Sequence, residues 1–105
     1  MIRAVFICEG DRLAGFEITG HSMFAQEGSD IVCSAVSAMS QLVINTITDV
    51  FLEKAQVIVE NEEEPEIFFK LDVSAGNASS ELIRGFRMQL QEFEGLYPDN
   101  LRVII

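Results

Sequence analysis

The segment from Ile31 to about Leu52 predicts a long helix that exposes very little polar surface. Its apolar residues recur every three or four positions and form one stripe: Val32, Val36, Met39, Val43, Ile47 and Val50. Four more apolar residues widen this stripe: Ile31, Ala35, Ala38 and Leu42. Ser29 or Asp30 is a good N-cap for the helix. We expect so apolar a helix to be largely buried, on a sheet and against a partner chain.

The remaining segments predict five strands and a second helix. The strands are read from alternating apolar residues, and they cover Ile2–Glu9, Leu13–Thr19, Gln56–Glu60, Ile67–Val73 and Leu101–Ile105. The second helix runs from about Ser80 to Leu96, and Gly85 is expected to mark close helix packing. Its inner face is predicted to carry Leu82, Phe86, Leu90, Phe93 and Tyr97.

The element order is therefore ββαββαβ. This order predicts an α+β fold, a two-layer sandwich in which a five-stranded, mostly antiparallel sheet carries both helices on one face. The 105 residues are enough for one hydrophobic core, so residues 1–105 are expected to form a single domain.

The chain is strongly acidic, with 17 acidic and 7 basic residues and a net charge of -10. A nucleic-acid-binding protein needs a basic surface, so we expect no direct contact with DNA or RNA. A solvated acidic surface is the ordinary explanation of such a charge, and the functional one is attraction of a basic partner.

The sequence predicts neither a membrane span nor secretion. The longest apolar run, around Val43–Ile47, is interrupted by Asn45 and Thr46. The first ten residues are too short and become charged too early for a signal peptide. Cys8 and Cys33 are therefore expected to be reduced thiols in a cytoplasm, and a disulfide bond between them is the alternative.

The candidate chemistry lies between Gly20 and Ser37. This stretch holds the only histidine, His21, and Cys33 follows it twelve positions later. If Asp30 caps the helix, Cys33 falls in its first turn, where free N–H groups and the helix dipole favour a thiolate. His21 would then act as base and acid, and the same N–H groups would hold an oxyanion.

The spacing also places Asp30, Cys33 and Ser37 on one edge of the helix. The loop between Gly20 and Gly28 is expected to hinge at these two glycines. The non-catalytic alternative is that Cys33 is a small core residue and His21 a solvated loop residue. Cysteines on apolar helices and single loop histidines more commonly have these structural roles than catalytic ones.

Cofactor sites are not expected. One histidine and two distant cysteines do not make a standard zinc site, and Glu62–Glu64 lacks the spacing of a calcium loop. There is no phosphate-binding loop or dinucleotide fingerprint. Cys8 is interpreted as a core residue of its strand.

Two linked motifs resemble the bacterial ribosomal-processing cysteine proteases, the Prp family. They are the Gly20-His21 pair and the segment Asp30–Ala38, which reads DIVCSAVSA where the family pattern is DIVCAAVSA. Ser34 is the departure, and it is a small one. The likeness extends over nearly the whole chain.

The resemblance implies a homodimeric cysteine protease that removes a short N-terminal extension from the precursor of a large-subunit ribosomal protein. By position, Cys33 would be the nucleophile and His21 the general base and acid. Asp30 and Ser37 match positions near the family's site. Gly20 and Gly28 would let the loop close over the substrate. The loop residues that are candidates for contact with the substrate are Ser22, Met23 and Phe24.

Two other functions remain open on the sequence. One is a non-catalytic acidic module that binds a ribosomal protein or an assembly intermediate. The other is a redox sensor, although no second cysteine lies near Cys33 to resolve an oxidised sulfur. If the chain is a protease, we expect Cys33 to be alkylated much faster than a free thiol while Cys8 stays protected.

Overall fold

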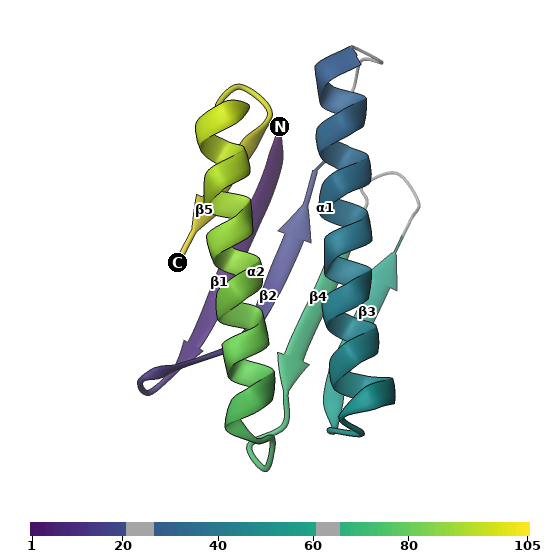
Figure 1. Ribbon diagram of the computed structural model, residues 1–105, viewed down its shortest axis with the longest axis vertical. Coiled ribbons are helices and arrows are strands. Elements are labelled where there is room, and N and C mark those ends of the chain that lie inside the picture. The colour runs from purple at the N-terminus through teal and green to yellow at the C-terminus, as the bar shows by residue number, and fades with distance from the viewer. Residues whose placement is uncertain (21–26, 61–65) are drawn as a thin grey trace.

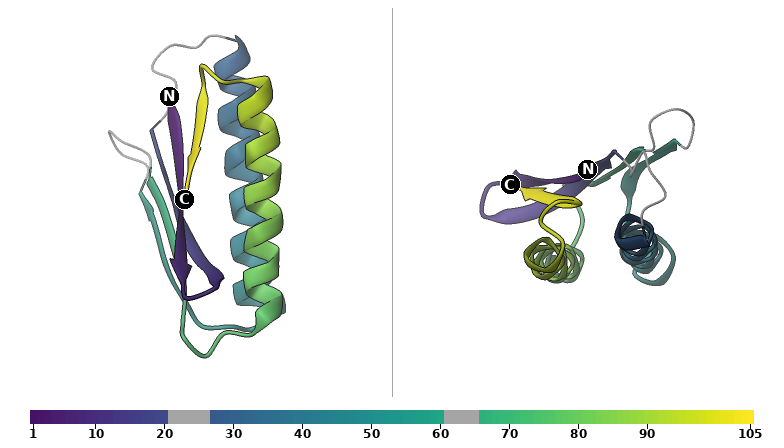
Figure 2. Two further views of the ribbon diagram at one scale, coloured as in Figure 1. Left: turned by 90° about the vertical axis from the view of Figure 1, so that its left-hand side faces the viewer. Right: turned by 90° about the horizontal axis from the view of Figure 1, so that it is seen from above.

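The structure is a computed structural model that describes residues 1–20, 27–60 and 66–105. For residues 27–30 it describes the backbone alone. Its elements in chain order are β1 (Ile2–Glu9), β2 (Arg12–Thr19), α1 (Glu27–Asn45), a π-helical turn (Thr46–Val50), β3 (Ala55–Glu60), β4 (Glu66–Leu71), α2 (Asn77–Leu96) and β5 (Leu101–Ile104). The strands form one sheet in the order β3-β4-β2-β1-β5. Both helices cover the same face of it (Figure 1, Figure 2). The predicted two-layer sandwich is confirmed.

The sheet is antiparallel except at one edge. β2 pairs antiparallel with both β1 and β4, and β3 pairs antiparallel with β4. β5 pairs parallel with β1, because α2 carries the chain across the sheet and returns it beyond β1. This arrangement makes β1 an interior strand, as its apolar residues on both faces predicted.

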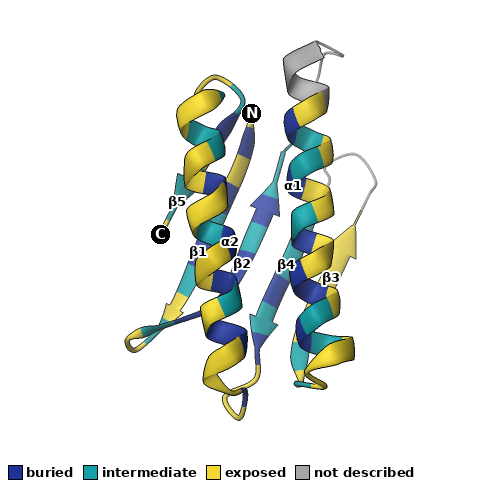
Figure 3. Ribbon diagram, viewed as in Figure 1, coloured by how far each residue is buried: buried dark blue, intermediate teal, exposed yellow. Residues whose placement is uncertain are grey.

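The core is centred on an aromatic cluster under α2. The Phe16 ring on β2 lies 4.9 Å from the Phe86 ring of α2 and 5.4 Å from the Phe69 ring of β4. The Phe6 ring of β1 approaches Phe86 to 5.8 Å. Offset and edge-to-face contacts of this kind add to the energy of apolar burial. Figure 3 shows buried residues along the sides of both helices that face the sheet.

The first helix differs from the prediction at both ends. It begins at Glu27, so Ser29 and Asp30 lie inside the helix and do not cap it. At its other end the chain passes into the π-helical turn, where the Thr46 and Thr48 hydroxyls donate to carbonyls four residues earlier. Leu52 then adopts a positive φ of 57°, which ends the helical path.

Only one side of α1 is buried. Val32, Val36 and Val43 pack in the core, whereas Leu42 is 66% exposed and Val50 of the π-helical turn is 70% exposed. Within the described residues, Ile31–Val50 is the one stretch long and apolar enough to span a membrane, with a mean hydropathy of 1.5. It packs on the sheet along one side only, so the expectation of a largely buried helix was wrong.

Three smaller predictions were wrong for local reasons. β4 ends at Leu71, so Val73 lies beyond the strand and is 82% exposed. α2 begins at Asn77, and it buries Ile83 in addition to Phe86 and Leu90. A Cβ on Gly85 would meet nothing within 4 Å, so this glycine marks no close packing.

Cys8 is exposed near the end of β1, beside an irregularity in the β1–β2 ladder. Ile7 pairs with Gly15, but Cys8 pairs with Leu13, so Ala14 is an extra residue in β2. Such a bulge breaks the simple alternation of side chains between the two faces. The strand pattern placed Cys8 with Phe6 in the core, and that assignment was wrong, because Cys8 lines an open cavity at the end of β1.

Gly15 is the glycine on which the sheet depends most. A Cβ there would lie 2.1 Å from the carbonyl oxygen of Phe69 and 2.9 Å from the Cα of Lys70. We therefore expect Gly15→Ala to lower the free energy of unfolding by about 3 kcal/mol, since β2 must shift from β4. Gly85→Ala is the matched control, because it adds the same methyl group in open space within a helix and should stabilise by up to about 1 kcal/mol. Urea unfolding of both variants checks this, and equal effects would contradict the account of the β2–β4 contact.

Candidate active site

Cys33 lies at the boundary between the buried and the exposed side of α1. Its thiol is free and partly buried, and it packs against the hydrophobic core. Val32 before it is fully buried, whereas Ser34 after it is exposed. A cysteine used as a nucleophile must be reachable by a substrate. Cys33 meets that condition, which a wholly buried core cysteine would not.

The position of Cys33 along α1 changes the expected electrostatics. Because the helix begins at Glu27, Cys33 is its seventh residue and lies in the second turn. The free N–H groups of a helix belong to its first four positions, and the effect of the dipole decays within the first turn. The free N–H groups and the dipole of the helix start, which were predicted to stabilise a thiolate, are therefore not available at the backbone of Cys33.

Gly20 fixes the point from which the histidine loop leaves the sheet. Its φ is +86°, a conformation that residues with a Cβ rarely adopt. A Cβ at this position would also lie 2.3 Å from the carbonyl oxygen of Met1. Gly20 is thus required by the backbone at the end of β2, in addition to the hinge role read from the sequence.

The loop residues themselves lie outside the described part of the chain. They include His21, Ser22, Met23 and Phe24, so the contact between His21 and Cys33 stays a prediction. The backbone does limit where the loop can run, because residues 21–26 join the end of β2 to the start of α1. Both of these ends lie at the same end of the molecule (Figure 1). Cys33 is roughly 9 Å along α1 from Glu27, towards the level at which β2 ends.

The other sequence candidates have mixed outcomes. Gly28 lies within α1, so the prediction that it hinges the loop was wrong. Asp30 is also helical, three residues before Cys33. Ser37 is exposed on the same helix edge, and its carbonyl accepts a hydrogen bond of 2.9 Å from the buried Ser40 hydroxyl. The sequence pattern did not single out Ser40.

Electrostatic shifts are few in the described residues. The pKa of Asp72 is lowered because its carboxylate accepts hydrogen bonds from the hydroxyl and the backbone N–H of Ser74. Asp72 lies in the loop before α2, at the opposite end of the molecule from the first turn of α1. No group of three or more metal-ligating side chains occurs within residues 1–20, 27–60 and 66–105.

Comparison with known proteins gives a consistent result over the whole fold. A family model described as cysteine protease Prp matches residues 1–102. The ribosomal processing cysteine protease Prp of Bacillus subtilis (strain 168) is 32% identical over 109 residues, which cover 98% of this chain and 96% of that protein.

Solved structures agree in fold. The protein SMU.848 from Streptococcus mutans superposes with a TM-score of 0.90 at 23% identity, covering 100% of this chain and 93% of that one. The essential ribosomal processing protease Prp from S. aureus, solved in complex with a substrate peptide, gives a TM-score of 0.86 at 18% identity. That match covers 98% of this chain and 97% of the S. aureus chain.

Proposed function

Because this chain belongs to the Prp family of cysteine proteases, we propose that it removes a short N-terminal extension from the precursor of a large-subunit ribosomal protein. Cys33 is the nucleophile and His21 the general base and acid. The observation that carries this assignment is the reachable free thiol of Cys33 on α1, at the same end of the molecule as the strand that leads into His21.

The chemistry follows that of a thiol protease. His21 takes the proton of the Cys33 thiol, and the thiolate attacks the carbonyl carbon of the scissile peptide bond. The C–N bond then breaks as protonated His21 donates its proton to the leaving amine. The N-terminal fragment remains bound to Cys33 as a thioester until water hydrolyses it.

One feature of the site supports a role for the loop. Gly20, directly before His21, has a positive φ that glycine adopts without strain. Closure of residues 21–26 over a bound peptide would exclude water and bring His21 to Cys33. Met23 and Phe24 are then the candidates for contact with apolar side chains of the substrate, and Ser22 is a further candidate contact.

The overall charge suits a basic substrate. The net charge of -10 attracts a positively charged ribosomal protein and speeds its encounter with the enzyme. We place the enzyme in the cytoplasm, where it needs no cofactor. We also infer a homodimer, because the exposed apolar side chains of Ile31 and Leu42 on α1 offer a surface to a second copy.

Thiol labelling tests the proposal against a non-catalytic binding module. At neutral pH an ordinary free thiol is only a few per cent thiolate, so we expect iodoacetamide to modify Cys33 about tenfold faster than Cys8, or more. Because Cys8 is exposed, it serves as the internal reference and is not the protected thiol that its strand pattern predicted. Mass spectrometry of the two cysteine-containing peptides measures both rates.

The control for this labelling is His21→Ala, which should reduce the Cys33 rate to that of Cys8. Equal and slow labelling of both thiols in the unmodified chain would favour the binding module and contradict the protease assignment.

A further inference from the structure

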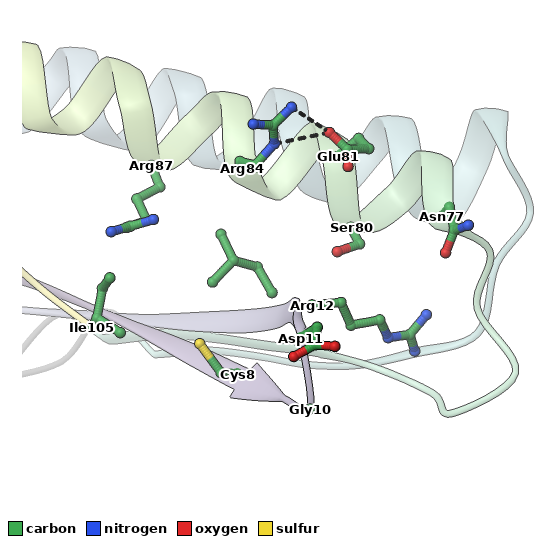
Figure 4. A pocket seen from close by; sticks show the side chains of 11 residues that line it. Cys8, Gly10, Asp11, Arg12, Asn77, Ser80, Glu81, Arg84, Arg87 and Ile105 are labelled. Carbon is green, nitrogen blue, oxygen red and sulfur yellow. Dashed lines mark hydrogen bonds and ion pairs between the residues drawn. The ribbon is translucent and has the colours of Figure 1, made fainter.

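A cavity opens between the β1–β2 turn and the first turns of α2. Its volume is about 290 Å³, and it lies at the opposite end of the molecule from the N-terminus of α1. Figure 4 shows side chains reaching into it from both layers. Arg87 and Ser80 extend from α2, and Cys8 and Arg12 come from the hairpin. Nothing in the proposed peptide cleavage uses this cavity.

Arg87 is the unexplained group in the cavity wall. Its Nε is shielded from solvent and has no hydrogen-bond partner in the described residues. Its guanidinium also makes no ion pair there, since the two pairs within this part of the chain are Lys70–Glu9 and Arg84–Glu81. A shielded donor without a partner costs free energy, so the Nε of Arg87 calls for an acceptor. Its partner is therefore expected to come from outside the described residues.

Two further arginines line the same cavity. Arg12 is held along its wall by a hydrogen bond of 2.7 Å from Nη1 to the carbonyl oxygen of Ala75. Arg84 is held at the rim by Glu81, with Nη2 and Oε2 2.8 Å apart. The cavity thus gathers three of the seven basic residues of an acidic chain. Arginine has only donors, and its planar fork matches the oxygens of an oxyanion.

The start of α2 adds uncharged donors to this set. Ser80 lies in the first helical turn, is 7% exposed and directs its hydroxyl towards the cavity (Figure 4). The free N–H groups of the same turn favour a negative charge nearby. Two carboxylate side chains also line the cavity, and Glu81 is already paired with Arg84, so Asp11 is the one without an ion pair among the described residues.

The charge and size of the site select the class of ligand. A nucleic acid would bring many phosphates against a net charge of -10, so a polyanion is disfavoured. A single tetrahedral oxyanion fits the cavity and leaves room for a small organic group beside it.

We propose that this cavity binds a phosphate group, either as inorganic phosphate or on a small phosphate monoester. The Arg87 guanidinium is the central contact, and Arg12, Arg84 and Ser80 complete the donor set. The site is separate from Cys33, so its ligand does not take part in peptide cleavage.

Isothermal titration calorimetry on the full chain tests this site with two probes, inorganic phosphate and glycerol 3-phosphate, each at constant ionic strength in chloride. We expect saturable binding in the unmodified chain and at least a tenfold loss of affinity in Arg87→Gln. Arg102→Gln is the matched control, because Arg102 is exposed on β5 and does not line the cavity. If Arg87→Gln does not fold, Arg87→Lys keeps the charge, removes the Nε donor and should also weaken binding.

Cys8 then locates the bound group. In a Cys33→Ala background it is the only thiol, and phosphate at ten times its dissociation constant should slow its alkylation by up to about tenfold. Tighter binding of glycerol 3-phosphate than of inorganic phosphate would identify a monoester as the ligand, and the reverse would identify the free ion. No saturable heat with either probe, or equal binding in Arg87→Gln, overturns the proposal.

Discussion

Replacing Cys33 with alanine is expected to abolish cleavage of a peptide that spans the extension junction of the ribosomal precursor. The substitution removes the only atom that can form the thioester, so kcat/KM should fall by a factor of about ten thousand or more. The fold should survive, because Cys33 is only partly buried and alanine suits a helix interior. Chromatographic assay of the two product peptides measures the rate, and a thermal melt measures the stability.

Cys8→Ala is the matched control for this loss. It removes the other thiol, which is exposed on β1 and lies at the cavity of the hairpin, and it should cleave the peptide at the unmodified rate. Cleavage retained in Cys33→Ala would exclude Cys33 as the nucleophile, whatever the result at Cys8.

Replacing His21 with alanine should produce the second largest loss. General acid–base catalysis contributes about a hundredfold to ten-thousandfold, so kcat/KM is expected to fall within that range. Residues 21–26 connect β2 to α1. The proposed role of His21 in this connection is chemical. The melting temperature should therefore change by only a few degrees at most.

Two measurements separate a chemical role of His21 from a structural one. Added imidazole should restore part of the activity of His21→Ala, since it supplies the missing base without refilling any packing site. The pH dependence of kcat/KM should also lose the limb that belongs to the histidine. A large drop in melting temperature without imidazole rescue would assign His21 to the stability of the fold.

The main features of the fold could be predicted because they depend on periodicity. The alternation in Ile2–Glu9 and the three- and four-residue spacing after Ile31 each identify an element and its buried face. Departures arose where a local feature overrides the period. The extra Ala14 breaks the alternation of β2, and residues Glu27–Asp30 continue the helix before the predicted cap.

The exposure of α1 shows a different limit. Its sequence is apolar on nearly every side. In a fold of one sheet layer and one helix layer, however, the helix buries only the side that faces the sheet. Leu42 and Val50 are therefore exposed although their residue types favour burial. Composition alone does not distinguish a helix surrounded by protein from one whose outer side is exposed.

The helix spacing predicted positions in the candidate site, and the roles of its residues stay predictions. Cys33 is reachable on the helix edge that the spacing indicated, and Ser37 is exposed on that edge. The left-handed φ of Gly20 has no signature except the glycine itself. The cavity between the hairpin and α2 was missed because Arg12 and Arg87 are far apart in the sequence and line one cavity only when α2 packs over the hairpin.

The most direct test uses the whole precursor of the ribosomal protein, with its extension intact. Mass spectrometry of the products, after incubation with the unmodified chain, identifies every bond that is cut. We predict one cut, which releases the N-terminal extension, and none when Cys33 is replaced by alanine. A precursor that keeps its full mass with the unmodified chain, or that is cut equally by both, would contradict the proposed function.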